Sequence, residues 1–96
     1  MPIIQTTKFK SNLPDEEVAR LLKERSVRFL EVPGLIQKYY LRDSQTGEIG
    51  AVYVWESAEA LQAFRQTELA QSMGDAYQIV GDKRVEIYEV TNILRD

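Results

Sequence analysis

"LIQKYYLRDSQTGEIGAVYVWES", residues 35 to 57, contains two runs rich in aliphatic and aromatic residues on either side of a short polar loop. Runs of this composition are typical of β-strands. The loop "SQTG" places Gly47 where a tight turn needs a positive φ. The stretch therefore predicts a β-hairpin made of residues 35–43 and 48–56. Ser57 follows the second strand directly and is typical of a residue that caps a helix.

Outside this hairpin, the sequence predicts two helices and two more strands. "PIIQTTKF", residues 2–9, is rich in β-branched residues and predicts a first strand. Pro14 and the three acidic residues after it predict the start of a helix, which ends before Pro33-Gly34. Its apolar face is Val18, Leu21, Leu22 and Phe29.

The second half of the chain predicts a helix, a short helical turn and a last strand. The helix after Ser57 buries Leu61 and Phe64, and the turn runs from Thr67 to about Met73-Gly74. Residues 77–83 predict a loop, and residues 84–94 an alternating strand. The order β-α-β-β-α-β is typical of a ferredoxin-like α+β domain, with two helices on one face of a four-stranded antiparallel sheet. We expect residues 1–96 to form this single domain.

Both faces of the predicted sheet carry apolar or aromatic side chains. Tyr39 and Tyr40 point to opposite faces, as do Val52 and Tyr53. Two helices cover only one face, so the other needs a cover of its own. The simplest cover is an identical subunit packed sheet against sheet, which predicts a homodimer. The alternative is a monomer whose second face is half solvated, with Tyr, Lys and Arg at its edges.

The composition removes several classes of function. The chain has no cysteine and no histidine, so a Ser-His-Asp triad, a Cys nucleophile and thiolate or imidazole metal sites are excluded. The net charge of −3 and the lack of a basic stripe argue against nucleic-acid binding. No signal peptide or membrane-spanning run is visible, which predicts a cytoplasmic chain that does not bind membranes. The acidic run at residues 15–17 is interpreted as a helix start, not as a metal site.

Arg25 lies within the apolar stripe of the first predicted helix. An inward-pointing guanidinium needs a partner, because an unpaired buried charge is costly. One interpretation is a pocket arginine that binds an anionic or carbonyl group of a ligand. The other is an ion pair with a sheet acid such as Glu89, or extension of the side chain to the helix edge.

Trp55 shares a face of the hairpin with Tyr53, and a four-residue loop brings Lys38 and Tyr40 to that same face. Such a group could stack a planar substrate and hydrogen-bond its oxygens. The alternative is that these rings only fill a dimer interface, where Trp and Tyr are enriched.

"VPGLIQKYYLRDSQTGEIGAVYVWESAEALQAF", residues 32–64, resembles the middle of the dimeric α/β-barrel monooxygenase family, and within it the YdhR-like set of the antibiotic-biosynthesis-monooxygenase superfamily. The resemblance rests on Pro33-Gly34-Leu35, Lys38-Tyr39-Tyr40, the Gly-containing hairpin and Val54-Trp55-Glu56-Ser57. It implies a homodimer whose two sheets close into a barrel, with a pocket between sheet and helices in each subunit.

The same resemblance implies oxidation of a small aromatic, quinol-like or hydroxylated hydrophobic compound by molecular oxygen, without flavin, metal or other cofactor. The protein would desolvate and orient a substrate whose own anion donates an electron to oxygen. No residue is assigned a catalytic role. The candidate substrate-binding residues are Arg25, Lys38, Tyr40, Tyr53, Trp55 and Phe64.

Two departures from the family pattern narrow this expectation. The heme-degrading relatives use an axial His and a second Trp, but this chain has no His and carries Phe64 where that Trp falls. Heme degradation by that scheme is disfavoured. Two other functions remain open: a non-catalytic dimeric small-molecule-binding or stress-related protein, and a module that dimerises and binds a protein partner through its helices.

Overall fold

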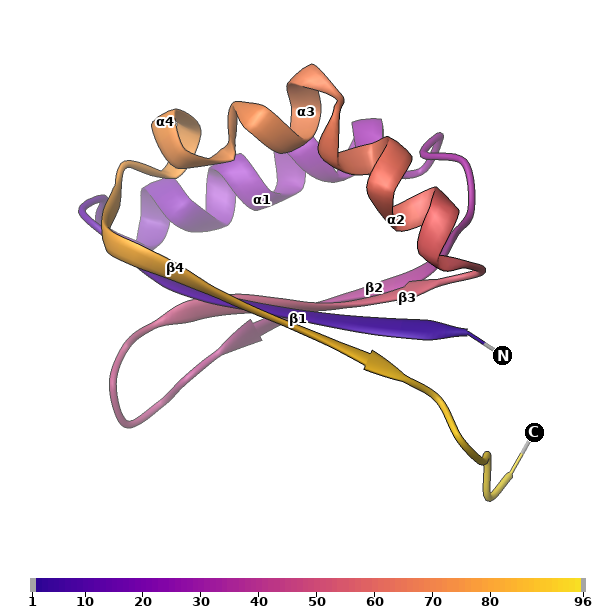
Figure 1. Cartoon of the computed structure of the whole chain (residues 1–96). Coiled ribbons are helices and arrows are strands. Elements are labelled where there is room, and N and C mark those ends of the chain that lie inside the picture. Colours follow the sequence, from indigo (N-terminus) through magenta and orange to yellow (C-terminus); the bar gives the residue numbers. More distant parts are fainter. Residues whose placement is uncertain (1, 96) are drawn as a thin grey trace.

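The computed structural model describes residues 2–95 and has one antiparallel sheet with all its helices on one side (Figure 1). The strands are β1 (Ile3–Ser11), β2 (Leu35–Arg42), β3 (Ile49–Trp55) and β4 (Ile79–Glu89), in the spatial order β2-β3-β1-β4. The helices are α1 (Asp15–Phe29), α2 (Ala58–Arg65), α3 (Glu68–Gln71) and α4 (Met73–Tyr77). This arrangement confirms the ferredoxin-like prediction.

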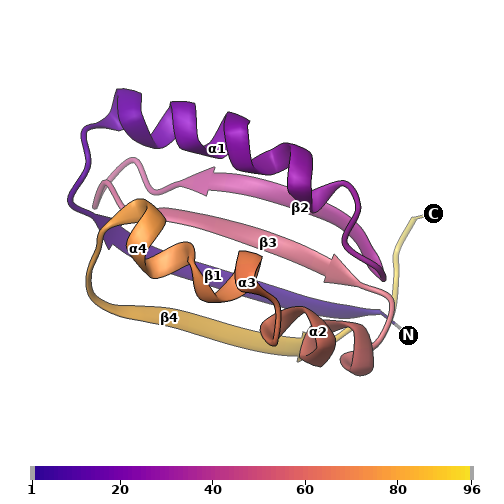
Figure 2. The same cartoon turned by 90° about the horizontal axis from the view of Figure 1, so that it is seen from above.

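Figure 2 shows α1 along the β2–β3 side of the sheet and α2, α3 and α4 along the β1–β4 side. The predicted hairpin is present, and Gly47 adopts a φ of +77° in its loop. Ser57 caps α2 as expected, since its hydroxyl accepts a hydrogen bond from the Ala60 N–H at 3.1 Å. No helix in residues 2–95 is long and apolar enough to cross a membrane.

The last strand differs from its prediction at both ends. It begins at Ile79, within the segment predicted as a loop, and ends at Glu89. The register against β1 shifts between Lys8 and Lys10, and Gly81 takes a φ of +73° at this irregularity. A glycine bulge therefore lets a turn-like sequence continue the strand. Glu89 pairs with Ile3, the first residue of β1, so the ladder ends where its partner ends.

The helical segment after α2 is longer than predicted. It consists of α3 and α4, and the latter continues to Tyr77 before Gln78 takes a left-handed φ of 49°. Together these short helices cover the part of the sheet that α1 and α2 leave open.

Two clusters of buried side chains lie between the sheet and the helices. The first contains Phe29, Ala51, Tyr53, Trp55, Leu61, Phe64 and Leu69. The second contains Phe9, Val18, Ile49, Met73 and Tyr77. They meet beneath α1, where the chain leaves a small internal space.

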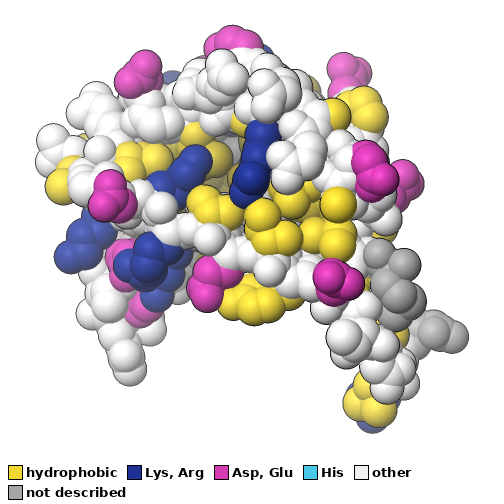
Figure 3. Space-filling view, in the orientation of Figure 1, with side chains coloured by type: hydrophobic (Ala, Val, Ile, Leu, Met, Phe, Trp, Pro, Cys, Tyr) yellow, Lys and Arg dark blue, Asp and Glu magenta, His cyan; other side chains and the backbone are white. Residues whose placement is uncertain are grey.

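The opposite face of the sheet is called the outer face here. It includes Ile4, Thr6, Tyr39, Val52, Val54 and Tyr88. No helix in the described part of the chain covers it, and Tyr39 and Tyr88 remain 56% and 50% exposed. The β2–β3 loop and the C-terminal segment extend beyond the sheet on this side, and hydrophobic side chains lie between these two projections (Figure 3).

Candidate functional site

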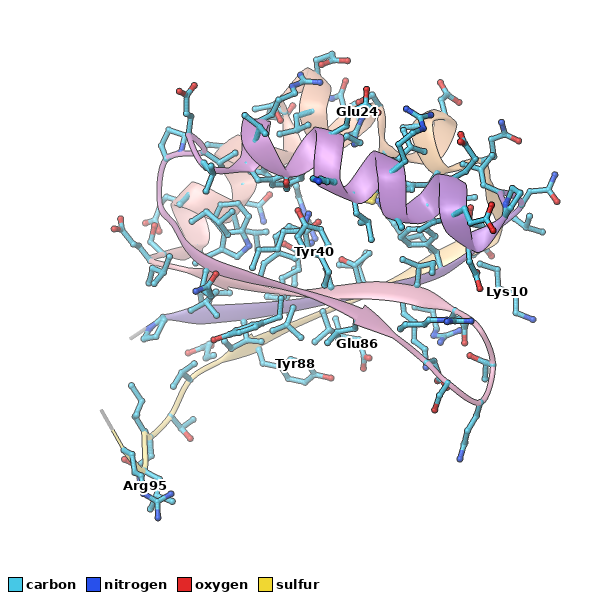
Figure 4. All side chains as sticks on the ribbon, turned by 180° about the vertical axis from the view of Figure 1, so that it is seen from behind. Lys10, Glu24, Tyr40, Glu86, Tyr88 and Arg95 are labelled. Atoms are coloured by element: carbon cyan, nitrogen blue, oxygen red, sulfur yellow. The ribbon has the colours of Figure 1, made fainter. Side chains whose placement is uncertain are left out.

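A cavity lies between the sheet, α1 and α4. Its wall includes two cationic and five aromatic side chains: Arg25, Lys38, Phe9, Phe29, Tyr40, Tyr53 and Tyr77. Its volume is about 20 Å³, enough for a single water molecule. Lys38 and Tyr40 come from the edge strand β2, and Tyr40 is 37% exposed between the sheet and α1 (Figure 4).

Lys38 extends its ammonium into a group of aromatic rings. Its Nζ lies 3.4 Å from the ring centre of Phe29, 4.5 Å from that of Tyr40 and 4.6 Å from that of Tyr53. Within residues 2–95 no carboxylate forms an ion pair with it. Burial, with a smaller contribution from the charge of Arg25, lowers the pKa of Lys38 to about 7. The ring faces favour the charged amine, whereas desolvation disfavours it.

Arg25 reaches the same cavity from α1. Its Nη2 donates to the Leu69 carbonyl at 2.9 Å and to the Ser72 hydroxyl at 3.2 Å. The guanidinium carbon lies 5.7 Å from the ring centre of Tyr77. The Nε–H is buried and has no hydrogen-bond acceptor. The ion pair with Glu89, one of the alternatives for Arg25, does not form among residues 2–95; the Leu69 carbonyl and the Ser72 hydroxyl hold this guanidinium instead.

The tyrosines of the cavity are held in the neutral form. Burial raises the pKa of Tyr53, which is 1% exposed, and also raises the pKa of Tyr40 and of Tyr77. Neutral hydroxyl groups can donate hydrogen bonds to an anionic ligand. The cavity therefore combines two nitrogen cations with neutral donors.

The structure brings together four of the six predicted residues, Arg25, Lys38, Tyr40 and Tyr53. It places Trp55 and Phe64 in the adjoining core cluster, outside the cavity wall. The indole of Trp55 stacks on Tyr53 with a 6° interplanar angle, and its N–H donates to the buried Gln5 Oε1 at 3.0 Å. That donor is already used within the core.

Tyr77 is one of the cavity residues that sequence reasoning missed. It lies in the segment predicted as a loop, although Leu69, Met73 and Tyr77 recur at the four-residue spacing of a helix face. Gly74 and Asp75 lie between these residues and are unfavourable in a helix, so the helical spacing was not recognised. Among residues 2–95, no group of three or more acidic side chains is arranged to hold a metal ion.

Comparison with known proteins gives one family. The family model described as "Putative mono-oxygenase ydhR" matches residues 3–95. No curated protein sequence matches the chain.

Solved structures share the fold at low sequence identity. The cofactor-independent oxygenase SnoaB from Streptomyces nogalater superimposes with a TM-score of 0.79 at 12% identity, covering 99% of this chain and 98% of that one. A putative antibiotic biosynthesis monooxygenase from Caulobacter crescentus gives 0.80 at 16% identity, with 95% and 91% coverage. A dimeric ferredoxin-like protein from Thermobifida fusca gives 0.76 at 12% identity, with 94% and 92% coverage.

Proposed function

Since the chain belongs to the family of the putative mono-oxygenase ydhR, we propose that it oxygenates a small hydroxylated aromatic compound with molecular oxygen and without a cofactor. The observation that carries this proposal is the pair of cations in an aromatic cavity. Arg25 and Lys38 line one small space with no carboxylate in its wall. Such a site stabilises negative charge on a bound ligand.

The chemistry needs no group beyond the substrate and oxygen. A phenol-like substrate loses its hydroxyl proton, and the electron-rich anion passes one electron to oxygen. The resulting superoxide combines with the ring radical at a C–H carbon para to the oxygen, which forms a hydroperoxide. Loss of water then leaves a quinone, so one oxygen atom enters the product and the other enters water. The protein contributes orientation, exclusion of water and stabilisation of the anion.

Within this reaction Arg25 and Lys38 would hold the substrate oxygen. The unpaired Nε–H of Arg25 is a buried donor that lacks an acceptor. The faces of Phe29, Tyr40 and Tyr53 offer a surface on which a planar ring can pack. The likeness to SnoaB is consistent with oxygenase chemistry on this fold, while the substrate class is argued from the cavity alone.

The proposal includes a homodimer formed through the outer face. A second copy would bury Tyr39, Val52 and Tyr88, which the helices leave uncovered. The Thermobifida fusca protein with this fold is described as dimeric, which supports the same arrangement here. The dimer would place one cavity in each subunit, on the helix side of its sheet.

The size of the cavity favours a second candidate, a non-catalytic binding protein for small aromatic compounds. A space of about 20 Å³ admits a ring only after side chains move. Such a protein would bind the same ligands but would not consume oxygen.

Oxygen uptake separates the two candidates. We would measure it with 1-naphthol, which carries a C–H carbon para to its hydroxyl group, against its autoxidation without protein and using chelator-treated enzyme. We expect uptake with formation of a quinone, and a decrease of at least about tenfold in the double variant Arg25→Met/Lys38→Met. Binding without uptake, detected by quenching of tyrosine and tryptophan fluorescence, would favour the binding protein.

A further inference from the structure

Lys38 differs from an ordinary substrate-holding cation in what surrounds its amine. The ring centres of Phe29, Tyr40 and Tyr53 lie within 5 Å of its Nζ, and no acidic side chain in residues 2–95 forms an ion pair with it. The titratable or charged groups that share its cavity are Arg25 from α1, Tyr40 from its own strand, Tyr53 from β3 and Tyr77 from α4. None of these is an anion at neutral pH, so no negative charge in the cavity wall holds the amine in its charged form.

These surroundings leave the amine partly unprotonated in neutral solution. Burial and the charge of Arg25 bring the pKa of Lys38 to about 7. A neutral amine has a lone pair that accepts a proton, whereas the Arg25 guanidinium stays charged and cannot do so. The tyrosines are poorer candidates, because burial raises the pKa of Tyr53 and of Tyr40. Lys38 is thus the group of the cavity best suited to accept a proton.

We propose that Lys38 is the general base of this cavity and removes the hydroxyl proton of a hydroxyaromatic ligand that enters in its neutral form. The O–H bond of the ligand breaks and an N–H bond forms on Nζ. The new ammonium and Arg25 then hold the phenolate. This inference rests on the proposed function and names its substrate class: weakly acidic phenols and enols, not preformed anions such as carboxylates.

A neutral ligand also costs less free energy to bring into the cavity than an anion does. An aromatic cavity gains from burying an uncharged ring, while an anion would first lose its hydration. After proton transfer the net charge of the site is unchanged, because an ammonium and a phenolate appear together. The ion pair forms only where water has been excluded, and there its attraction is strong.

The decisive measurement is proton release on binding of 3-nitrophenol, whose anion has its own visible absorption band. The titration is anaerobic, so no oxygenation interferes. With wild-type protein at pH 8 the bound probe should show the anion band with almost no proton released, because the proton stays on Lys38. At pH 6, where Lys38 is already protonated, the neutral probe should release about one proton to the solvent when it binds as its anion. Equal release at both pH values would overturn the proposal, and this test needs no variant.

Variants provide the second test. Lys38→Arg keeps a cation but no base, so the bound anion should appear with release of about one proton at pH 8. Lys38→Met should bind the probe in its neutral form. Lys23→Met, which changes an exposed lysine of α1, is the matched control and should behave as wild type. Formation of the anion by Lys38→Met to the wild-type extent would refute the role of this residue.

Oxygen uptake keeps this inference distinct from the proposed function. If wild type ionises the probe and Lys38→Met does not, but no naphthol causes oxygen uptake, then Lys38 is the general base and the proposed oxygenase function is refuted. If oxygen uptake and probe ionisation are both equal in wild type and Lys38→Met, then the proposed oxygenase function stands and the role of Lys38 as general base is refuted.

Discussion

Trp55 is the most completely buried residue of the core, and its indole N–H is committed to another side chain. It is 0% exposed, packs 5.2 Å from the ring centre of Phe64, and donates to Gln5. Gln5 in turn donates to the Thr7 hydroxyl at 3.3 Å. This short polar chain fixes the indole against β1, so its first role is structural.

Replacement of Trp55 by Phe tests that role. The change leaves a void and removes the donor to the buried Gln5 Oε1, so we expect the free energy of unfolding to fall by about 2–3 kcal/mol. Urea denaturation followed by circular dichroism measures it. Affinity for 3-nitrophenol should stay within about twofold, since the indole is outside the cavity wall. A tenfold loss of affinity at unchanged stability would instead assign Trp55 to the ligand.

Lys38 makes stability depend on pH in a defined direction. Its pKa is about 7 in the folded chain and returns to 10.5 on unfolding, so between these values the unfolded state binds more protons. Stability therefore rises as pH increases from 7 to 9, by no more than about 1.4 kcal/mol per pH unit. Above that range the tyrosines oppose it, because burial raises the pKa of Tyr53. Urea denaturation of Lys38→Met should show a flatter profile, and parallel profiles would contradict the lowered pKa.

At the scale of the elements, Gly34 joins the start of β2 to α2. Its φ is +79°, and an added Cβ would collide with the Cβ of Ala60. Its carbonyl also accepts a hydrogen bond from the Glu56 N–H at 2.8 Å. The position therefore requires glycine for two reasons, the backbone conformation and the close approach of the helix.

Gly47 makes a matched control for Gly34, because its φ is nearly the same, +77°, and nothing lies within 4 Å of its added Cβ. Gly47→Ala should cost about 1 kcal/mol of unfolding free energy from backbone strain alone. Gly34→Ala should cost about 3 kcal/mol, since overpacking against Ala60 is added. Urea titrations of the two variants measure the difference. Equal losses would show that α2 moves away from Gly34 without cost.

The hairpin was predictable because its information is local. Alternation and the "SQTG" loop set the register, so Lys38 shares a face with Tyr53 as expected while Tyr39 faces the other side. The start of β4 was not predictable in this way, because its bulge depends on pairing with β1. Alternation also places Trp55 and Tyr53 on one face, but does not reveal which helix covers each. The positions of the covering helices place Tyr53 in the cavity wall and Trp55 in the core.

At the scale of the whole molecule, the sheet has one face buried under helices and one face without a cover. On the outer face, Val52 lies between Thr6 of β1 and Tyr39 of β2, near the middle of the sheet. The β2–β3 loop and the C-terminal segment extend on the same side and border this surface (Figure 4). A second copy could seat its own sheet there.

The substitution Val52→Asp should therefore dissociate the proposed dimer into monomers. In a two-fold interface the change occurs twice, so two carboxylates lose water and lie among apolar side chains of both copies. Val27→Asp is the matched control, because Val27 is 64% exposed on α1 and far from the outer face. By sedimentation velocity we expect wild type and Val27→Asp to be dimers and Val52→Asp a monomer with native circular dichroism. A monomeric wild type would refute the dimer, and a Val52→Asp dimer as tight as wild type would show that the interface is not on the outer face.

The cavity lies on the helix side of the sheet, so ionisation of 3-nitrophenol by the monomer would show that each subunit's site works without its partner.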